Sequence, residues 1–274
     1  YYASRGLGDV YKRQFKDILE KGEKSKYLDW YYIDELPLKG EWGEIPNFLC
    51  FGYYGGMPKL NLKNPEVANY ITDVACYWIR ECDIDGWRLD VGDEISHFFW
   101  KNFRKAIKAV KKDMLIIGEI WHYAGDFLEG DEWDTVMNYP FYLNLIDLLA
   151  DEKINVSQFV QNLGYLKGRL NKKCYPLMWN LIDSHDTARF LHLCHDNKKK
   201  QHLAAAFQLL MPGMPMVYYG DEYAMPGAND PDCRRGMYWD EEYQDKEMYN
   251  WYKKLMQILS LIHISEPTRR VVIS

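Results

Sequence analysis

The sequence predicts an α/β fold that forms part of a (β/α)₈ barrel. Short apolar segments alternate with helical segments along residues 61–258, which is typical of parallel strands joined by crossover helices. About five such units follow one another, and acidic residues stand at the ends of several strands, as they do at the active face of such barrels. A doubly wound open sheet is the alternative, but no glycine-rich nucleotide-binding loop follows the first strand.

The ordered part begins with a helix near Asn64. Asn64 is a suitable N-cap, and Pro65 suits the first helical position because its fixed φ matches the helix. Apolar residues then recur at helical spacing, namely Val67, Ile71, Val74 and Trp78. A helix with one buried face is therefore expected here.

Strands and helices alternate from this helix to residue 258. Strands are predicted near 84–91, 114–121 (MLIIGEIW), 134–139 (DTVMNY), 176–186 (PLMWNLIDSHD) and 214–220 (MPMVYYG). Helices are predicted near 95–111, between about 143 and 170, and at 201–210 and 246–258. Each strand is short and apolar, as expected of strands that are buried on both faces.

The two ends of the chain differ from the segment between them. The runs SRGLGDVYKRQ (Ser4–Gln14) and LSLIHISEPTRR (Leu259–Arg270) resemble translations of the two strands of a transposase-based sequencing adapter. We therefore expect residues 1–14 and 259–274 to be adapter-like artefacts outside the fold. A native amphipathic tail is the alternative, and the codons of the gene decide between the two.

The composition of residues 15–60 and of the whole chain bears on the domain organisation and on the possible partners of the protein. Residues 15–60 are irregular and aromatic, and Gly, Pro and Trp recur without a 3.6 or 2 period, so we expect a loop-rich insertion or a small subdomain. The net charge of −6 gives no basic footprint for nucleic acid. No apolar run spans a membrane and no signal peptide is visible. None of the six cysteines forms a CxxC pair, which argues against zinc and favours reduced thiols in a cytoplasmic protein.

Three predicted strands end in acidic residues. GWRLDV supplies Arg88 and Asp90, IIGEIW supplies Glu119, and LIDSHDTAR supplies His185 and Asp186. Each has a structural explanation when taken alone: an ion pair, a strand-end cap, or a hydrogen-bonded core histidine. In a parallel barrel, however, these strand ends meet at one face, where three carboxylates would repel one another.

Glycoside hydrolysis is a reaction that uses such a cluster. It needs a carboxylate nucleophile, a carboxylic acid that protonates the leaving oxygen, and negative charge near an oxocarbenium-like transition state. A guanidinium beside the nucleophile would keep it ionised. Apolar neighbours such as Ile117, Ile120 and Trp121 would favour the protonated form of the acid.

The same segments resemble a known family. GWRLDV, GEIW and DSHDTAR are similar to three sequence regions of the α-amylase superfamily, glycoside hydrolase family 13. The resemblance implies that Asp90 is the nucleophile, Glu119 the general acid/base and Asp186 the transition-state stabiliser, with Arg88 and His185 contacting the nucleophile and the sugar. It further implies substrate contacts from Glu94, Trp121, His122 and Arg189.

A subgroup is indicated by three further runs. MPKLN (Met57–Asn61), DVGDEISHFFW and ANDPDCRRGMYWD are similar to neopullulanase, cyclomaltodextrinase and maltogenic amylase. Glu94 fits this subgroup, whereas Asp93 replaces its usual Asn and leaves the acceptor preference open. The implied substrates are cyclodextrins, pullulan or maltooligosaccharides, cleaved at α-1,4 bonds and, as an open point, α-1,6 bonds. No cofactor is implied, and no site for a structural calcium ion is legible.

The resemblance also concerns what lies outside the chain. It implies that the segment holds about strands 4 to 8 of the barrel, with residues 15–60 as the insertion called domain B. A full-length parent would form a homodimer through its N-terminal domain. Two alternatives stay open: a non-catalytic glucan-binding or scaffold relative, and an inactive truncated fragment of the enzyme.

Overall fold

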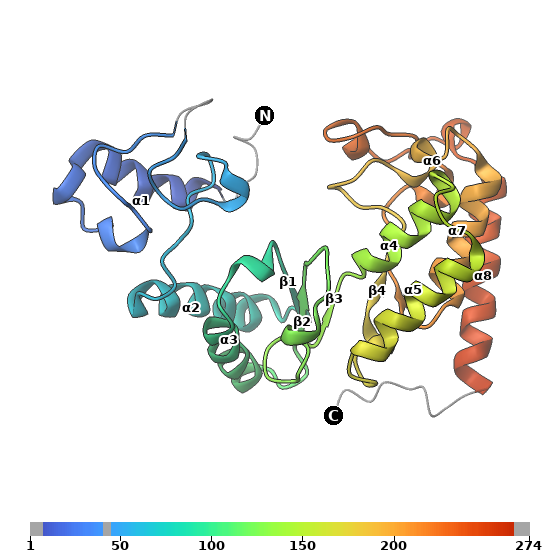
Figure 1. The fold of residues 1–274 in the computed structure, drawn as a ribbon, viewed down its shortest axis with the longest axis horizontal. Helices are drawn as coiled ribbons and strands as arrows, with labels where there is room; N and C mark the ends of the chain where they lie inside the picture. Colours follow the sequence, from blue (N-terminus) through green and yellow to red (C-terminus); the bar gives the residue numbers. More distant parts are fainter. Residues whose placement is uncertain (1–7, 41–44, 266–274) are drawn as a thin grey trace. The chain divides into compact units, whose positions relative to one another are not determined.

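The computed structural model describes residues 8–40 and 45–265, and for residues 8–12 and 262–265 it describes only the secondary structure. The chain divides into two compact units, whose elements Figure 1 labels. The N-terminal unit comprises Tyr1–Asp85 and Val91–Met114, and the barrel unit comprises Gly86–Asp90 and Leu115–Ser274.

The N-terminal unit begins with helix α1, Gly8–Lys21. The prediction that residues 15–60 are irregular throughout is therefore wrong for residues 15–21. Ile18 on this helix is buried and packs with Trp30, Tyr31 and Val67. Once residues 1–14 are set aside, the helical part that remains is too short for its periodicity to show. The described residues between 22 and 60 form 3₁₀ turns and isolated antiparallel bridges, such as Tyr31–Leu60.

Two further helices lie in the described part of the N-terminal unit; the first begins where the sequence predicts, and the second begins two residues later than predicted. In α2, Pro65–Cys82, the Asn64 side chain accepts a hydrogen bond from the backbone N–H of Glu66 at 2.9 Å. In α3, His97–Val110, the Ser96 side chain accepts one from the N–H of Phe99 at 3.4 Å. These side chains satisfy N–H groups that have no partner within the first turn. The two helices pack against each other.

The buried face of α2 differs from the predicted one. Val74 and Trp78 are exposed, whereas Ala75, Cys76 and Ile79 are buried. Apolar residues occur almost all round this helix, so spacing alone does not select one face.

Among its described residues, the barrel unit holds five short strands that run parallel and follow one another in chain order. Strands β1 (Gly86–Leu89), β2 (Leu115–Gly118) and β3 (Thr135–Val136) pair side by side, as Figure 1 shows. Strands β4 (Trp179–Asn180) and β5 (Met214–Pro215) form a second parallel pair. A parallel bridge between Met137 and Trp179 joins the two groups. This order confirms the predicted partial (β/α)₈ barrel, although each strand is shorter than its apolar run.

Helices separate the later strands of the barrel unit. They are α4 (Tyr139–Leu145), continued by a π-helical turn (Ile146–Ala150), α5 (Val156–Arg169), α6 (Phe190–Leu193), α7 (Lys198–Leu210) and α8 (Lys246–Ser265). A capping box begins α5, because the Asn155 side chain accepts from Gln158 N and the Gln158 side chain accepts from Asn155 N. Helix α6 was not predicted, because four residues carry no periodicity.

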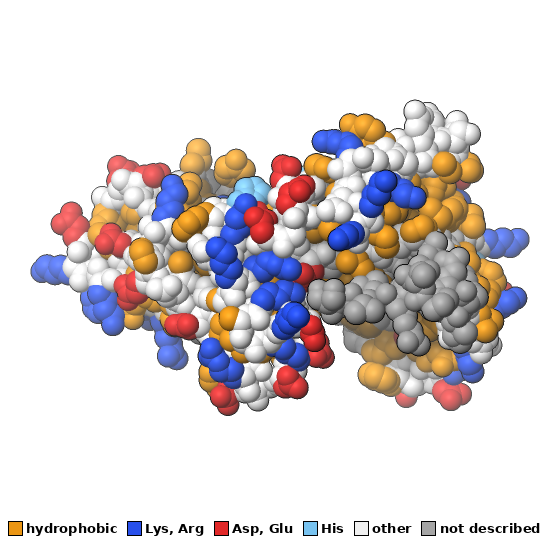
Figure 2. Space-filling view, turned by 90° about the horizontal axis from the view of Figure 1, so that it is seen from below, with side chains coloured by type: hydrophobic (Ala, Val, Ile, Leu, Met, Phe, Trp, Pro, Cys, Tyr) orange, Lys and Arg blue, Asp and Glu red, His pale blue; other side chains and the backbone are white. Residues whose placement is uncertain are grey.

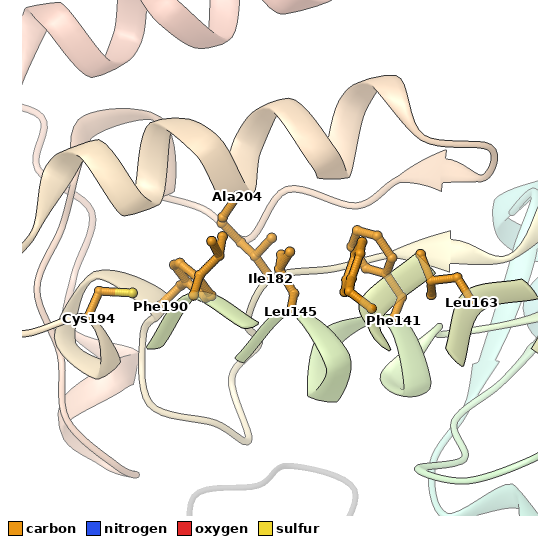
Figure 3. Packing of buried hydrophobic residues seen from close by; sticks show 9 residues of the cluster. Phe141, Leu145, Leu163, Ile182, Phe190, Cys194 and Ala204 are labelled. Carbon is orange, nitrogen blue, oxygen red and sulfur yellow. The ribbon is translucent and has the colours of Figure 1, made fainter. Parts of the chain in front are cut away.

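One apolar cluster packs these helices together. Figure 3 shows Phe141 and Leu145 of α4 with Leu163 of α5, Ile182 and Phe190. Each of these side chains is at most 5% exposed, and burying one contributes about 1.5–3 kcal/mol. Ile182 and Phe190 flank the loop that carries Asp186, so this cluster anchors both ends of that loop.

Gly118 ends β2 directly before Glu119, and its place admits no side chain. A Cβ atom there would overlap the ring of Trp133, which is buried and stacks on Phe127. We expect Gly118→Ala to lower the free energy of unfolding by about 1–3 kcal/mol, measured by urea denaturation. Gly164→Ala on the exposed side of α5, where a Cβ meets nothing within 4 Å, is the matched control. Equal stability of the two variants would contradict this reading of β2.

Candidate active site

Arg88 lies among the three predicted carboxylates of the barrel unit. Its Nη1 donates a hydrogen bond to Asp90 Oδ1, and its Nη2 lies 3.0 Å from Glu119 Oε1 and 3.8 Å from Asp186 Oδ2. One oxygen from each carboxylate lies within 4.8 Å of the other two. The structure thus brings together residues that are far apart in the chain, with one guanidinium offsetting their mutual repulsion.

The strand register places Asp90 beside Glu119. Leu89 pairs with Gly118 at the ends of β1 and β2, and the N–H of Glu119 donates to the carbonyl of Leu89 at 2.9 Å. The two carboxylates therefore follow neighbouring parallel strands at the same level. Their surroundings differ: the Asp90 side chain is 68% exposed, whereas that of Glu119 is 5% exposed. Two carboxyls in such different environments suit two different roles in one reaction.

Asp186 lies in a tight turn beyond β4. Its N–H donates to Ser184 Oγ at 3.1 Å, and the N–H of Ser184 donates to Thr187 Oγ1 at 2.9 Å. Burial would raise the pKa of Asp186, but the hydrogen bond from His185 and the charges of His185, Arg234 and Arg88 outweigh burial and hold that pKa below its usual value. Asp186 is therefore ionised at neutral pH, and Nε2 of His185 lies 3.0 Å from its Oδ2.

Trp121 extends the cluster with an aromatic surface. Its Nε1 donates to Glu119 Oε1 at 3.2 Å, and its ring stacks on Tyr139 with centroids 4.1 Å apart. The Trp121 side chain is partly exposed, whereas Tyr139 is buried. Burial raises the pKa of Tyr139, so this phenol stays protonated. Sequence reasoning missed Tyr139, although it is the last residue of the predicted strand DTVMNY.

The remaining predicted residues fall in different places. His122 follows Trp121 and is exposed, so its contact with substrate stays a prediction. Glu94 belongs to the N-terminal unit, where its Oε2 lies 2.6 Å from Nζ of Lys59. Its predicted role also stays a prediction.

The prediction for Arg189 is wrong. Its side chain is fully buried, and Nη1 donates to the carbonyl of Tyr219 at 2.7 Å and to Oδ1 of Asp221 at 3.1 Å. The guanidinium carbon lies 4.5 Å and 4.9 Å from the ring centroids of Tyr218 and Tyr219. No surface of the side chain remains for a substrate, because Arg189 is fully buried. Its positive charge instead stabilises the two buried carboxyls of Asp183 and Asp221.

Arg234 is a site residue that sequence reasoning missed. Its Nη2 lies 3.0 Å from Asp186 Oδ1, although the two residues are far apart in the chain. Arg234 stands in the run ANDPDCRRGMYWD, which indicated the subgroup. The sequence did not show that this run contacts Asp186.

Comparison with known proteins agrees with the family resemblance that the sequence motifs indicate. Residues 13–260 match the family model described as the α-amylase catalytic domain. The chain is 47% identical over 244 residues to a cyclomaltodextrinase of Geobacillus thermopakistaniensis (strain MAS1), which covers 89% of this chain and 41% of that protein. It is 43% identical over 245 residues to neopullulanase 2 of Thermoactinomyces vulgaris, again covering 89% and 41%. The chain thus spans about two fifths of the length of these curated relatives.

Solved structures agree with this match. A cyclomaltodextrinase structure superposes with a TM-score of 0.87 at 43% identity and covers 90% of this chain and 42% of that one. The cyclic α-maltosyl-(1→6)-maltose hydrolase of Arthrobacter globiformis, in complex with its cyclic maltosyl-maltose, gives 0.84 at 35% identity and covers 89% and 55%.

Proposed function

The chain belongs to the α-amylase catalytic-domain family, and from this premise we propose that it carries the catalytic residues of a retaining α-glucan hydrolase. The observation that carries the proposal is the close spacing of Asp90, Glu119 and Asp186, each of which has one carboxylate oxygen within 4.8 Å of one oxygen of the other two. Retaining glycosidases hold their two carboxyls about 5–5.5 Å apart, whereas inverting enzymes leave about 6.5–9.5 Å for an intervening water. The spacing here favours direct attack by a carboxylate.

In the proposed reaction, Asp90 attacks the anomeric carbon while the bond from that carbon to the leaving oxygen breaks. Glu119 donates its proton to that oxygen, and a covalent glycosyl-enzyme results. Glu119, now ionised, then takes a proton from water, whose oxygen attacks the anomeric carbon and releases Asp90. The negative charge of Asp186 stabilises the oxocarbenium-like transition states, and Arg88 keeps the cluster together. No step needs a cofactor; a structural calcium ion stays an open question.

The proposed substrates are cyclodextrins, pullulan or maltooligosaccharides, cleaved at α-1,4 bonds, with α-1,6 bonds as an open point. Support comes from the names of the relatives, which include cyclomaltodextrinase, maltogenic α-amylase and neopullulanase 2. Trp121 supports a sugar substrate independently, since a partly exposed indole beside the acid provides a stacking surface.

The test uses the full-length protein of which this segment forms part. We expect it to release reducing ends from β-cyclodextrin, pullulan or maltoheptaose, measured by a reducing-sugar assay. Binding of these glucans without turnover would instead support the alternative of a non-catalytic glucan-binding or scaffold protein.

The 274-residue chain expressed alone is expected to be inactive and prone to aggregation. Within the part of the barrel unit that the structure describes, β1 pairs only with β2 and β5 only with β4, so each has an unpaired edge. Exposed strand edges promote association between chains. A monomer with a cooperative thermal transition and turnover of maltoheptaose would contradict this expectation.

The proposed setting is cytoplasmic, which is supported by the 42% identity to the intracellular maltogenic amylase of Bacillus subtilis. A homodimer of the full-length protein remains part of the proposal.

The proposal includes no nucleic-acid or membrane partner. On the face shown in Figure 2, basic and acidic side chains are interspersed. No helix among the described residues combines the length and the apolar character needed to cross a bilayer.

A further inference from the structure

A surface cavity lies between helices α7 and α8 of the barrel unit. The two helices pack against each other and lie side by side in Figure 1. The cavity has a volume of about 430 Å³, a size typical of sites for small molecules. This α7–α8 cavity is lined by one residue of α7 and four of α8, namely His202, Glu247, Asn250, Trp251 and Lys254. None of them belongs to the carboxylate cluster.

The four lining residues of α8 share one face of the helix. Counted from Glu247, the other three stand three, four and seven positions later, which is the spacing of neighbours on a helix surface. The adjoining face of α8 is buried in the core through Met248, Tyr252 and Leu255. The wall of the cavity is therefore part of an anchored helix, and its shape does not depend on a loop.

The indole of Trp251 forms the apolar wall of the cavity. Its Nε1 donates a hydrogen bond to the backbone carbonyl of His202 at 2.8 Å, and the His202 ring meets it edge-to-face with centroids 5.6 Å apart. Trp251 also packs against the core cluster of α7 and α8, yet it stays partly exposed. These contacts hold the indole in one orientation, so a sugar ring can stack on it without the entropic cost of ordering the side chain.

The polar lining suits an uncharged ligand with many hydroxyl groups. Among the described residues, the side chains of Glu247, Asn250 and Lys254 make no hydrogen bond or ion pair, so they are available to a ligand. The carboxylate accepts hydrogen bonds, the ammonium donates them and the amide does both, which matches hydroxyl groups that donate and accept. The charges of Glu247 and Lys254 offset each other, so the lining favours neither an anion nor a cation.

We propose that the α7–α8 cavity is a second binding site for an α-glucan chain, which holds a polymeric substrate on the barrel unit outside the carboxylate cluster. This inference rests on the proposed glycosidase function, whose substrate is that polymer. A polymer bound at one site has a raised effective concentration at the other, whereas a short oligosaccharide occupies one site at a time. The cavity should therefore favour turnover of long glucans and leave that of short ones unchanged.

The experiment compares three alterations of α8 in the full-length protein. Trp251→Ala removes the stacking surface, and the double variant Asn250→Ala/Lys254→Ala removes two exposed polar side chains of the lining. Lys253→Ala is the matched control, because it removes an exposed ammonium of the same helix that does not line the cavity.

Binding and turnover are measured separately. Native electrophoresis in gels that contain pullulan measures binding, in a Glu119→Gln background so that the polymer stays intact. We expect the dissociation constant for pullulan to rise about tenfold in Trp251→Ala and about threefold in the double variant, with no change in Lys253→Ala. With Glu119 restored, KM for pullulan should rise by similar factors at unchanged kcat, whereas KM for maltotriose should stay constant.

Two results would overturn the inference. One is unchanged binding of pullulan by both cavity variants in their folded state, which would make the cavity a packing surface only. The other is an equal rise in KM for pullulan and maltotriose, which would mean that the substitutions disturb the catalytic site. If Trp251→Ala fails to fold by circular dichroism, the double variant decides by the same criteria. Lack of turnover in the unsubstituted protein would refute the proposed function, while the gel assay decides on the cavity without turnover, so the two failures are distinguishable.

Discussion

Asp90→Ala in the full-length protein is expected to lose on the order of 10⁴-fold or more in kcat on maltoheptaose, which is typical when an enzyme loses its nucleophile. The carboxylate follows β1, contacts Arg88 and lies beside Glu119, which is the place that the proposed mechanism gives to the nucleophile. Asp85→Ala is the control, because this side chain lies just before β1 and is 99% exposed. Equal activity of Asp90→Ala and Asp85→Ala would remove Asp90 from the mechanism.

Azide separates the two roles assigned to Asp90 and Glu119. With an α-glucosyl fluoride, azide can attack from the side that Asp90→Ala leaves vacant, so fluoride departs and a β-glucosyl azide forms by one inversion. In Glu119→Ala, Asp90 still forms the glycosyl-enzyme, and azide then gives the α-azide by a second inversion. Nuclear magnetic resonance distinguishes the anomers. If Asp90→Ala gave the α-azide and Glu119→Ala gave the β-azide, Glu119 would be the nucleophile and Asp90 the acid/base, which contradicts the proposed roles.

Arg189→Met is expected to have the largest effect on stability, lowering the free energy of unfolding by about 3–5 kcal/mol, as is typical when one partner of a buried ion pair is removed. Arg189, Asp183 and Asp221 are each at most 1% exposed. Burial raises the pKa of Asp183, and burial with the nearby charge of Asp183 raises that of Asp221 well above its usual value. The variant leaves these two buried carboxyls without their guanidinium.

The pH dependence of this effect has a definite sign. A raised pKa means that the folded state binds more protons than the unfolded state, so stability is present at low pH and falls as pH rises. Loss of the Arg189 charge raises the pKa of the Asp183–Asp221 pair further, so the destabilisation should grow between pH 5 and pH 8. Urea denaturation at several pH values measures it. Arg169→Met, which removes an exposed guanidinium over the Tyr123 ring, is the control, and an equal loss in both would contradict a buried ion pair.

Site residues that are placed by their own strand were predictable from the sequence, whereas residues that are placed by contacts with distant parts of the chain were not. Asp90 and Glu119 were predictable, because each directly follows an apolar run that forms a strand, and parallel strands bring such ends together. The role of Arg189 was predicted wrongly, because Arg189 belongs to the same DSHDTAR motif as Asp186, whereas its side chain pairs with Asp221, which is far away in the chain. Arg234 could not be assigned, since its contacts with His185 and Asp186 join two loops.

The same reasoning applies to the fold. The order and direction of the strands followed from alternating apolar and helical segments, and the start of α2 followed from Asn64 and Pro65. The lengths of the strands could not be predicted from the sequence. For example, β4 comprises only Trp179–Asn180, although the predicted strand is much longer. A strand ends where the twist of the sheet carries it out of hydrogen-bonding distance of its neighbours. The sequence of a single strand does not show where this happens.

The most direct test of the central claim identifies the residue that becomes glycosylated. Glu119→Gln in the full-length protein is treated with a 2-deoxy-2-fluoro or 5-fluoro glucosyl fluoride, whose leaving group needs no acid, and the absence of the Glu119 base slows hydrolysis of the adduct. Mass spectrometry of peptides is predicted to find the sugar on Asp90. An adduct on Asp186, or no adduct together with release of the β-anomer, would contradict the account.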